Sequence, residues 1–131
     1  IISFHPEADK SSIDIIKNIT SNNCRAGIAI HPKIKVSDIV QYLEIIDLIV
    51  VMTVVPGFGG QKFMESEVSK ILELKKIKDE KKLSFEIEID GGINKNTAKI
   101  CKQNGADVLV AGSYIFSNKR EMYKSMIDSL R

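Results

Sequence analysis

The chain alternates short apolar runs, rich in β-branched residues, with stretches in which apolar residues recur every three or four positions. The apolar runs occupy 1–4, 26–30, 48–54 and 108–111, and a fifth strand is expected over 85–89, where Phe-Glu-Ile-Glu-Ile alternates apolar and acidic residues. The run 48–54 is apolar at nearly every position, as a strand covered on both faces must be. Strands that alternate with helices form a parallel sheet with right-handed crossovers. The sequence therefore predicts an α/β fold, either an open doubly wound sheet or part of a (β/α)8 barrel.

Helical spacing follows each of these runs, at 13–21, 36–43, 64–78, 94–104 and 122–130. Asn94 or Asn96 is the expected N-cap of the fourth helix, and Gly105 the residue just after its end. No long linker or low-complexity segment separates the five strand–helix units. In both candidate architectures ligands bind at the C-terminal ends of the strands, so functional residues are expected there.

The amino-acid composition argues against nucleic acid and membranes as binding partners. The 131 residues carry 19 basic and 17 acidic side chains and a net charge of +2, which gives no global field for nucleic acid or an anionic membrane. The run 48–55 is much shorter than the ~20 residues that span a bilayer. Cys24 and Cys101 lie far apart without a CxxC pair and favour two reduced thiols. We expect a cytoplasmic protein that binds neither nucleic acid nor membrane.

The segment Pro56-Gly57-Phe58-Gly59-Gly60-Gln61 stands between the third strand and its helix. Its three glycines allow a sharp turn and can present N–H groups to an anion. It lacks the Gly-Lys-Ser/Thr ending of a Walker A loop, and its spacing does not fit GxGxxG. A flexible connector is the alternative. Phe58 favours a functional loop, because an aromatic side chain in a mobile loop is more useful over a pocket than in solvent.

Two further strand ends carry chemistry. Asp90-Gly91-Gly92 could form an ordinary turn, or supply an acid/base group or metal ligand beside N–H groups that approach a phosphate. Gly112-Ser113 could be a plain helix N-cap. Taken with Gly91 and Gly92, however, it matches the phosphate site that barrels build from the loops after strands 7 and 8.

Other polar or polarizable residues have plainer interpretations. His5 and His31 each end a strand before a proline, and a structural role is favoured over a shared metal. Met52 lies in a buried strand, close enough to its end to face a pocket. The lysine-rich stretch 75–82 mixes both charge signs and predicts a solvated helix end, not a nucleic-acid site.

Together the strand-end motifs resemble the ribulose-phosphate 3-epimerase family. The matching stretches fall in the family's order and at its spacing: 4–8, 26–30, 51–63, 88–93 and 111–113. The run Met-Thr-Val-x-Pro-Gly-Phe-Gly-Gly-Gln-Lys-Phe within 52–63 is highly specific. Val55 stands where relatives usually carry Asn or Glu.

The resemblance implies a (β/α)8 TIM barrel that interconverts D-ribulose 5-phosphate and D-xylulose 5-phosphate, an isomerase of the pentose phosphate pathway. In such enzymes two Asp residues act on opposite faces of C3, and a divalent metal (Zn, Fe, Mn or Co) stabilises the ene-diolate. By resemblance Asp90 is one of these acid/base residues and a metal ligand. The implied substrate-binding residues are Met52 near the reacting carbons, Gly57, Phe58, Gly59 and Gly60 over the substrate, and Gly91, Gly92, Gly112 and Ser113 at the phosphate.

The resemblance also places residues 1–131 as the C-terminal part of a single barrel domain, an incomplete barrel of about five βα units. The family's other Asp and two metal-binding His would precede Ile1. Such an arc is expected to expose two sheet edges and its apolar inner face, and so to self-associate, while the full-length protein is expected to be a homo-oligomer. The alternatives are an epimerase of a related ketose phosphate, such as allulose 6-phosphate, and a phosphate-binding chain without catalysis.

Overall fold

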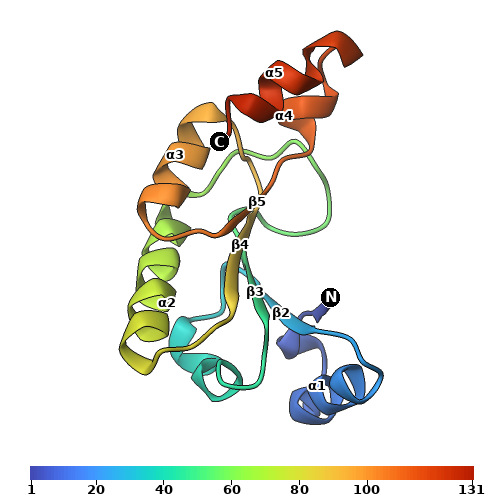
Figure 1. The fold of residues 1–131 in the computed structure, drawn as a ribbon, viewed down its shortest axis with the longest axis vertical. Helices are drawn as coiled ribbons and strands as arrows, with labels where there is room; N and C mark the ends of the chain where they lie inside the picture. The colour runs from blue at the N-terminus through green and yellow to red at the C-terminus, as the bar shows by residue number, and fades with distance from the viewer.

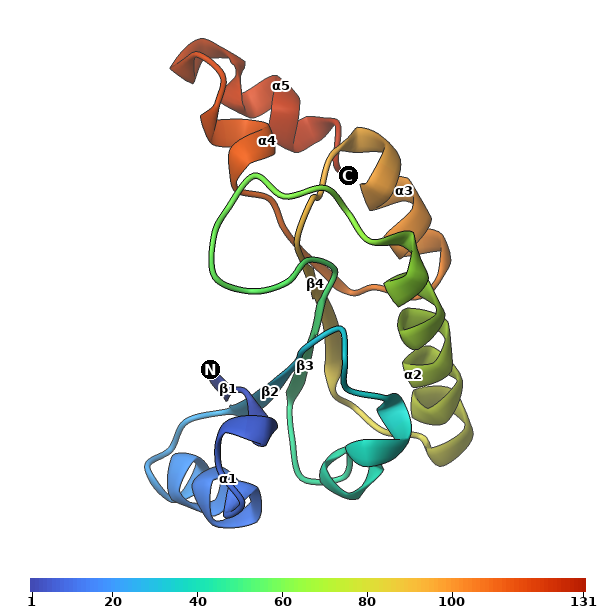
Figure 2. The ribbon, with the colours of Figure 1, turned by 180° about the vertical axis from the view of Figure 1, so that it is seen from behind.

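A computed structural model describes all residues 1–131. One parallel sheet, in the order β1-β2-β3-β4-β5, contains all five strands. The strands are β1 (Ile2–Phe4), β2 (Ala26–Ile30), β3 (Leu48–Met52), β4 (Glu86–Asp90) and β5 (Val108–Val110). Spatial order follows chain order without the reversal of a doubly wound sheet. The molecule is therefore an incomplete barrel of five βα units, as predicted (Figures 1 and 2).

The main core lies between the outer face of the sheet and three helices, α1 (Ser12–Ser21), α2 (Val68–Lys81) and α3 (Lys95–Gln103). Ile28, Ile49 and Ile87 are fully buried on the sheet side, and Ile71 and Leu74 of α2 pack against the same core. Cys101 of α3 belongs to this core, where burial raises the pKa of its thiol to about 11, and both cysteines are free. None of the helices is long and apolar enough to cross a membrane.

The apolar inner face of the sheet was expected to be exposed to solvent, but its central side chains are buried. Ala29, Leu48, Val50 and Met52 are only 5–8% exposed and form a second apolar cluster with Val54. Curvature of a parallel sheet brings such side chains together, so the central strands shield one another. The edges do stay open, since Ile2 on β1 and Val110 on β5 keep 49% and 38% of their surface.

The predicted helix over 36–43 is wrong. Two short 3-10 turns, Val36–Asp38 and Val40–Tyr42, replace it, and Ile39 between them leaves the helical region with φ −121° and ψ 2°. The segment is too short for a stable α-helix on propensity alone, and its β-branched residues weaken that propensity further. The apolar residues at three and four spacing still point inward, because Val36, Ile39 and Leu43 are buried.

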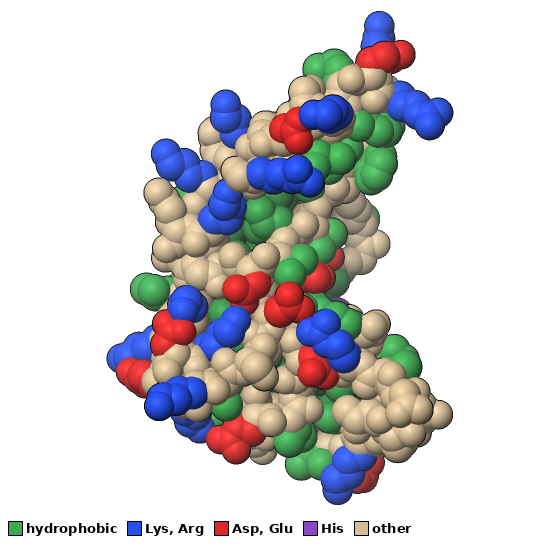
Figure 3. Space-filling view, in the orientation of Figure 1, with side chains coloured by type: hydrophobic (Ala, Val, Ile, Leu, Met, Phe, Trp, Pro, Cys, Tyr) green, Lys and Arg blue, Asp and Glu red, His purple; other side chains and the backbone are tan.

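The C-terminal region forms two short helices, α4 (Ser113–Phe116) and α5 (Tyr123–Asp128), that stand off from the sheet (Figure 1). We expected Met122, Met126, Ile127 and Leu130 to line a packed closing helix. Instead Met122 and Ile127 are 45% and 40% exposed, and Phe116 is 67% exposed. Figure 3 shows hydrophobic surface in this part of the molecule.

The surface of α2 carries alternating charges, as the lysine-rich stretch predicts (Figure 3). Lys75 pairs with Asp79 one turn later, and Lys78 pairs with Asp107 just before β5. The Lys75–Asp79 pair is exposed and contributes little to stability, at most about 1 kcal/mol, while the Lys78 side chain is half-buried. The two pairs also leave no uniformly basic face on this helix.

One ion pair at the start of α2 is nearly buried. Glu67, the last residue of the 3-10 turn Glu65–Glu67, lies with its Oε2 2.7 Å from Lys70 Nζ, and their side chains are 7% and 13% exposed. The contact is an electrostatic one without hydrogen-bond alignment at Oε2. The same ammonium donates a 2.7 Å hydrogen bond to the carbonyl of Pro32, after β2. Lys70 therefore ties α2 to the loop that follows β2.

Replacing this lysine tests its structural role. Lys70→Met should lower the free energy of unfolding by about 3 kcal/mol, because it leaves a buried carboxylate without its cation. Lys76→Met is the matched control, since the Lys76–Glu80 pair is 3.8 Å long and exposed, and it should change stability by less than about 0.5 kcal/mol. Urea denaturation measures both, and equal effects of the two variants would contradict the role of Lys70.

Candidate functional site

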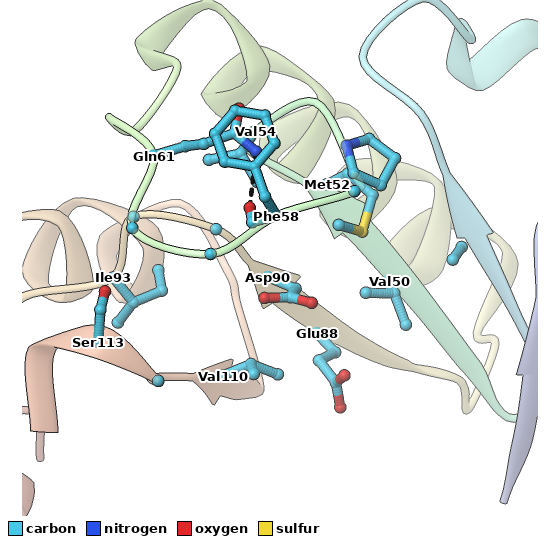
Figure 4. Close-up of a pocket in the computed structure, with 18 of the residues that line it drawn as sticks. Val50, Met52, Val54, Phe58, Gln61, Glu88, Asp90, Ile93, Val110 and Ser113 are labelled. Atoms are coloured by element: carbon cyan, nitrogen blue, oxygen red, sulfur yellow. Dashed lines mark hydrogen bonds between the residues drawn. The ribbon is translucent and has the colours of Figure 1, made fainter. Parts of the chain in front are cut away.

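A cavity of about 590 Å³ lies at the C-terminal ends of the strands, on the inner side of the sheet (Figure 4). All ten site residues predicted from the sequence line it. They are Met52, Gly57, Phe58, Gly59, Gly60, Asp90, Gly91, Gly92, Gly112 and Ser113. Segments more than fifty residues apart in the chain thus meet around one space.

The register of the sheet sets this meeting point. Met52 at the end of β3 pairs with Asp90 at the end of β4, and Asp90 pairs in turn with Val110 of β5. Side chains alternate along a strand, so residues paired at one level point to the same face. The Asp90 carboxyl group therefore stands on the cavity floor beside the Met52 side chain (Figure 4).

The corner after Asp90 requires glycine at two successive positions. Gly91 and Gly92 have φ values of +130° and +63°. A Cβ on Gly91 would lie 2.6 Å from Val54 Cγ2, and one on Gly92 would lie 2.5 Å from the backbone nitrogen of Phe63. The two glycines thus let the chain turn while packing directly under the loop that follows β3. The carbonyl of Gly92 is held in turn by the Thr97 hydroxyl at 3.1 Å.

Thr53 fastens the end of β3 to this corner. Its backbone N–H donates to the Asp90 carbonyl at 2.9 Å, and its buried hydroxyl donates to the Gly91 carbonyl at 2.7 Å. The sequence interpretation gave Thr53 no function. Its one signal was a hydroxyl inside an otherwise apolar run, where a buried polar group needs a partner.

Three carboxylates lie at alternate positions of β4 and so share the inner face. Glu86 is paired with Arg25 at 2.9 Å. The side-chain carboxyl groups of Glu88 and Asp90 accept no hydrogen bond and lie in no ion pair, and both residues line the cavity. Burial raises the pKa of Asp90, and burial followed by the charges of Asp90 and Glu86 raises the pKa of Glu88. Glu88 was missed from the sequence, although alternation in Glu-Ile-Glu-Ile-Asp signals a shared face.

The other rim of the cavity comes from the start of α4. Gly112 is the residue before the helix and Ser113 its first residue, with no side-chain capping hydrogen bond. The Ser113 side chain is therefore not engaged as a cap. Figure 4 shows it across the cavity from Met52, on the same side as Ile93.

The two histidines lie in different places, one at the cavity and one outside it. His5 lines the cavity, with its Nδ1 buried and 3.4 Å from Glu7 Oε1. His31 lies outside it, and its Nδ1 accepts a hydrogen bond from Lys33 N. No three His, Cys, Asp or Glu side chains lie close enough together to hold a metal ion. The two histidines therefore do not meet in the cavity, and Asp90 is the carboxylate that the resemblance assigns as a metal ligand.

The model of the ribulose-phosphate 3-epimerase family matches residues 1–116. The ribulose-phosphate 3-epimerase of Escherichia coli K12 is 37% identical over 131 residues, which cover 100% of this chain and 57% of that protein. The Bacillus subtilis ribulose-phosphate 3-epimerase is 43% identical over 117 residues, covering 88% of this chain and 54% of that protein. The chain thus spans little more than half the length of the curated relatives it matches.

Solved structures with lower identity share the fold. KGPDC from Streptococcus mutans superposes with a TM-score of 0.60 at 16% identity, over 89% of this chain and 51% of that one. A mutant flavocytochrome b2 with pyruvate bound gives a TM-score of 0.61 at 19% identity, over 91% of this chain and 31% of that one. At such identities the likeness concerns the architecture alone.

The glycine corner yields a stability test. Gly92→Ala should lower the free energy of unfolding by at least about 2 kcal/mol, because the new Cβ meets the Phe63 backbone at a strained φ. Gly59→Ala is the control, since no atom lies within 4 Å of its Cβ position. Thermal or urea unfolding compares the two variants. Equal tolerance of both would show that the corner is not tightly packed.

The uncompensated carboxylates yield a pH test. A raised pKa means that the folded state holds protons that the unfolded state has released, so stability falls as pH rises through that range. Glu88→Gln removes this penalty and should be more stable than the wild type at pH 7 when metal is chelated. The difference should disappear below about pH 4, where the carboxyl is protonated in both states. A less stable variant at pH 7 would contradict the raised pKa.

Proposed function

Because this chain belongs to the ribulose-phosphate 3-epimerase family, we propose that residues 1–131 are the C-terminal part of an epimerase built on a single TIM-barrel domain. The whole enzyme interconverts D-ribulose 5-phosphate and D-xylulose 5-phosphate by moving a proton at C3. It thereby serves as an isomerase of the pentose phosphate pathway. The observation that carries the proposal is the unpaired Asp90 carboxyl group, set in one cavity with three glycine-containing strand ends.

Phosphate binding is the first role of the site. Gly91 and Gly92 after β4, and Gly112 and Ser113 after β5, lie at adjacent strand ends on one side of the cavity. Backbone N–H groups without side chains in the way can approach a phosphate closely, and a serine hydroxyl adds a further donor. This grip explains how a chain with a net charge of only +2 would hold a sugar phosphate.

Proton transfer is the role of Asp90. A raised pKa brings a carboxyl group closer to neutral pH, where it can both accept and return a proton. Met52 at the same level of the sheet supplies an apolar wall beside the reacting carbons. Inversion at C3 needs a second acid/base group on the opposite face of the substrate. That group belongs to a part of the enzyme outside residues 1–131.

A divalent cation fits this carboxylate. The Asp90 carboxyl group accepts no hydrogen bond and shares the cavity with no Lys or Arg side chain, and carboxylate oxygen is a common ligand of zinc, iron, manganese and cobalt. In this proposal Asp90 is the ligand that residues 1–131 supply, and the remaining ligands belong to the rest of the whole enzyme. The bound cation would stabilise the negative charge that develops on the ene-diolate oxygens.

The cysteines and the exposed apolar side chains bear on the cell compartment and the oligomeric state of the enzyme. Two free cysteines, one with its pKa raised by burial, favour the reducing cytoplasm. The exposed apolar side chains Phe116, Met122 and Ile127 favour contacts with further protein, consistent with a homo-oligomer of the whole enzyme.

Substitution of the acid/base residue is the decisive experiment. Asp90→Asn in the longest chain that the gene encodes should reduce turnover of D-ribulose 5-phosphate by about 10³-fold or more, while retaining the fold. The control is Asp79→Asn, an exposed carboxylate on α2, which should leave turnover unchanged. Proton NMR in D₂O follows both epimerisation and exchange at C3. Wild-type turnover by Asp90→Asn would overturn the catalytic assignment.

Substrate and completeness are tested in the same assay. D-Ribulose 5-phosphate should be turned over with a higher kcat/KM than allulose 6-phosphate, and the reverse order would assign the hexose derivative as substrate. The chain 1–131 alone should bind phosphate without epimerising, with or without added divalent metal. Full turnover by these residues alone would show that one Asp suffices.

A further inference from the structure

A backbone hydrogen bond closes the base of the loop between β3 and α2, but few hydrogen bonds form within the loop itself. Met64 N donates to the Thr53 carbonyl at 2.9 Å and closes the base. Between these two residues, the glycine loop (residues 54–63) contains no backbone–backbone hydrogen bond at all. A segment that contains three glycines and no such bonds has a large conformational entropy to lose on ordering.

One side chain supplies the missing bonds. The Gln61 amide nitrogen Nε2 donates to the Val55 carbonyl at 2.6 Å and to the Phe58 carbonyl at 2.8 Å. These are the only hydrogen bonds formed within the glycine loop. A primary amide carries two N–H donors, so a single side chain can make both bonds at once. Gln61 therefore bridges from the end of the loop back to its beginning and its tip.

The bridge shapes the wall of the cavity. Gly57, Gly59 and Gly60 line the cavity, and their N–H groups are not used by any backbone acceptor. Phe58 at the tip is 73% exposed, and Figure 4 shows its ring on the side of the loop that faces away from Asp90. Because the bridge fixes Val55 and Phe58, it also fixes the peptide groups between them.

We propose that Gln61 is a positioning residue that holds the glycine loop in a preformed arch over the substrate. The sugar phosphate then meets donors that are already ordered, and little of its binding energy goes into folding a flexible lid. This inference rests on the proposed function for the identity of the substrate. The ordering of the loop by Gln61 itself is independent of it.

Proteolysis tests the ordering directly. In the longest chain that the gene encodes, chymotrypsin should cut after Phe58 about tenfold faster in Gln61→Met, which keeps the side-chain length and loses both donors. Gln41→Met is the matched control, because Gln41 is exposed and makes no hydrogen bond. Cleavage after Phe116 serves as the internal standard. An unchanged rate at Phe58 would overturn the proposal.

Kinetics separates positioning from general destabilisation. Gln61→Met should raise KM for D-ribulose 5-phosphate by about tenfold and leave kcat within about twofold, since the lost ordering is restored on binding. A lower kcat with unchanged KM would refute the preformed arch. Should Gln61→Met not fold, Gln61→Asn keeps the amide on a shorter arm, and chymotrypsin should cut it after Phe58 faster than it cuts the wild type. An unchanged rate in this variant would likewise overturn the proposal. If the wild type does not epimerise, the proposed function fails, and the cleavage rates still decide the role of Gln61.

Discussion

The parallel pairing of β3 with β4 is the constraint on which the site depends. It sets Met52 beside Asp90, and the Thr53 hydroxyl then fastens the next turn to the carbonyl of Gly91. Two glycines allow Val54 and Phe63 to press directly against this corner. Direct packing and hydrogen bonds thus connect Asp90, the turn at Gly91 and Gly92, and the base of the glycine loop. A shift of a single residue in the register would turn Asp90 away from the cavity.

Much of this was predictable from the sequence, because the strongest signals were local. Four apolar runs and one alternating stretch predicted the five strands. Asn94, one of the two expected N-caps, caps α3 through hydrogen bonds from Asn96 N and Thr97 N. Asp90 was singled out by its place at a strand end before two glycines and by the family resemblance. The helix expected over 36–43 does not form. The apolar residues there have helical spacing, but the segment is short and rich in β-branched residues, which weakens its helix propensity.

The residues that sequence reasoning missed share a physical reason. Thr53 and Gln61 act through backbone carbonyls, which every residue possesses and no sequence pattern marks. Alternation along β4 places Glu88 on the inner face, but its raised pKa comes from burial and from the charges of Asp90 and Glu86, which only the folded sheet brings about. The apolar inner face was misjudged for the same reason, since curvature hides Leu48 and Val50 from water. Folding geometry, not residue type, decides such features.

The order of the strands has a consequence for how the chain folds during its synthesis. Each strand pairs only with the strands immediately before and after it in the chain, so no late segment must return to an early one within these five units. During synthesis on the ribosome, each unit can therefore dock on its predecessor as soon as it emerges. The five strands can thus be added to the sheet one after another in the order in which they are made.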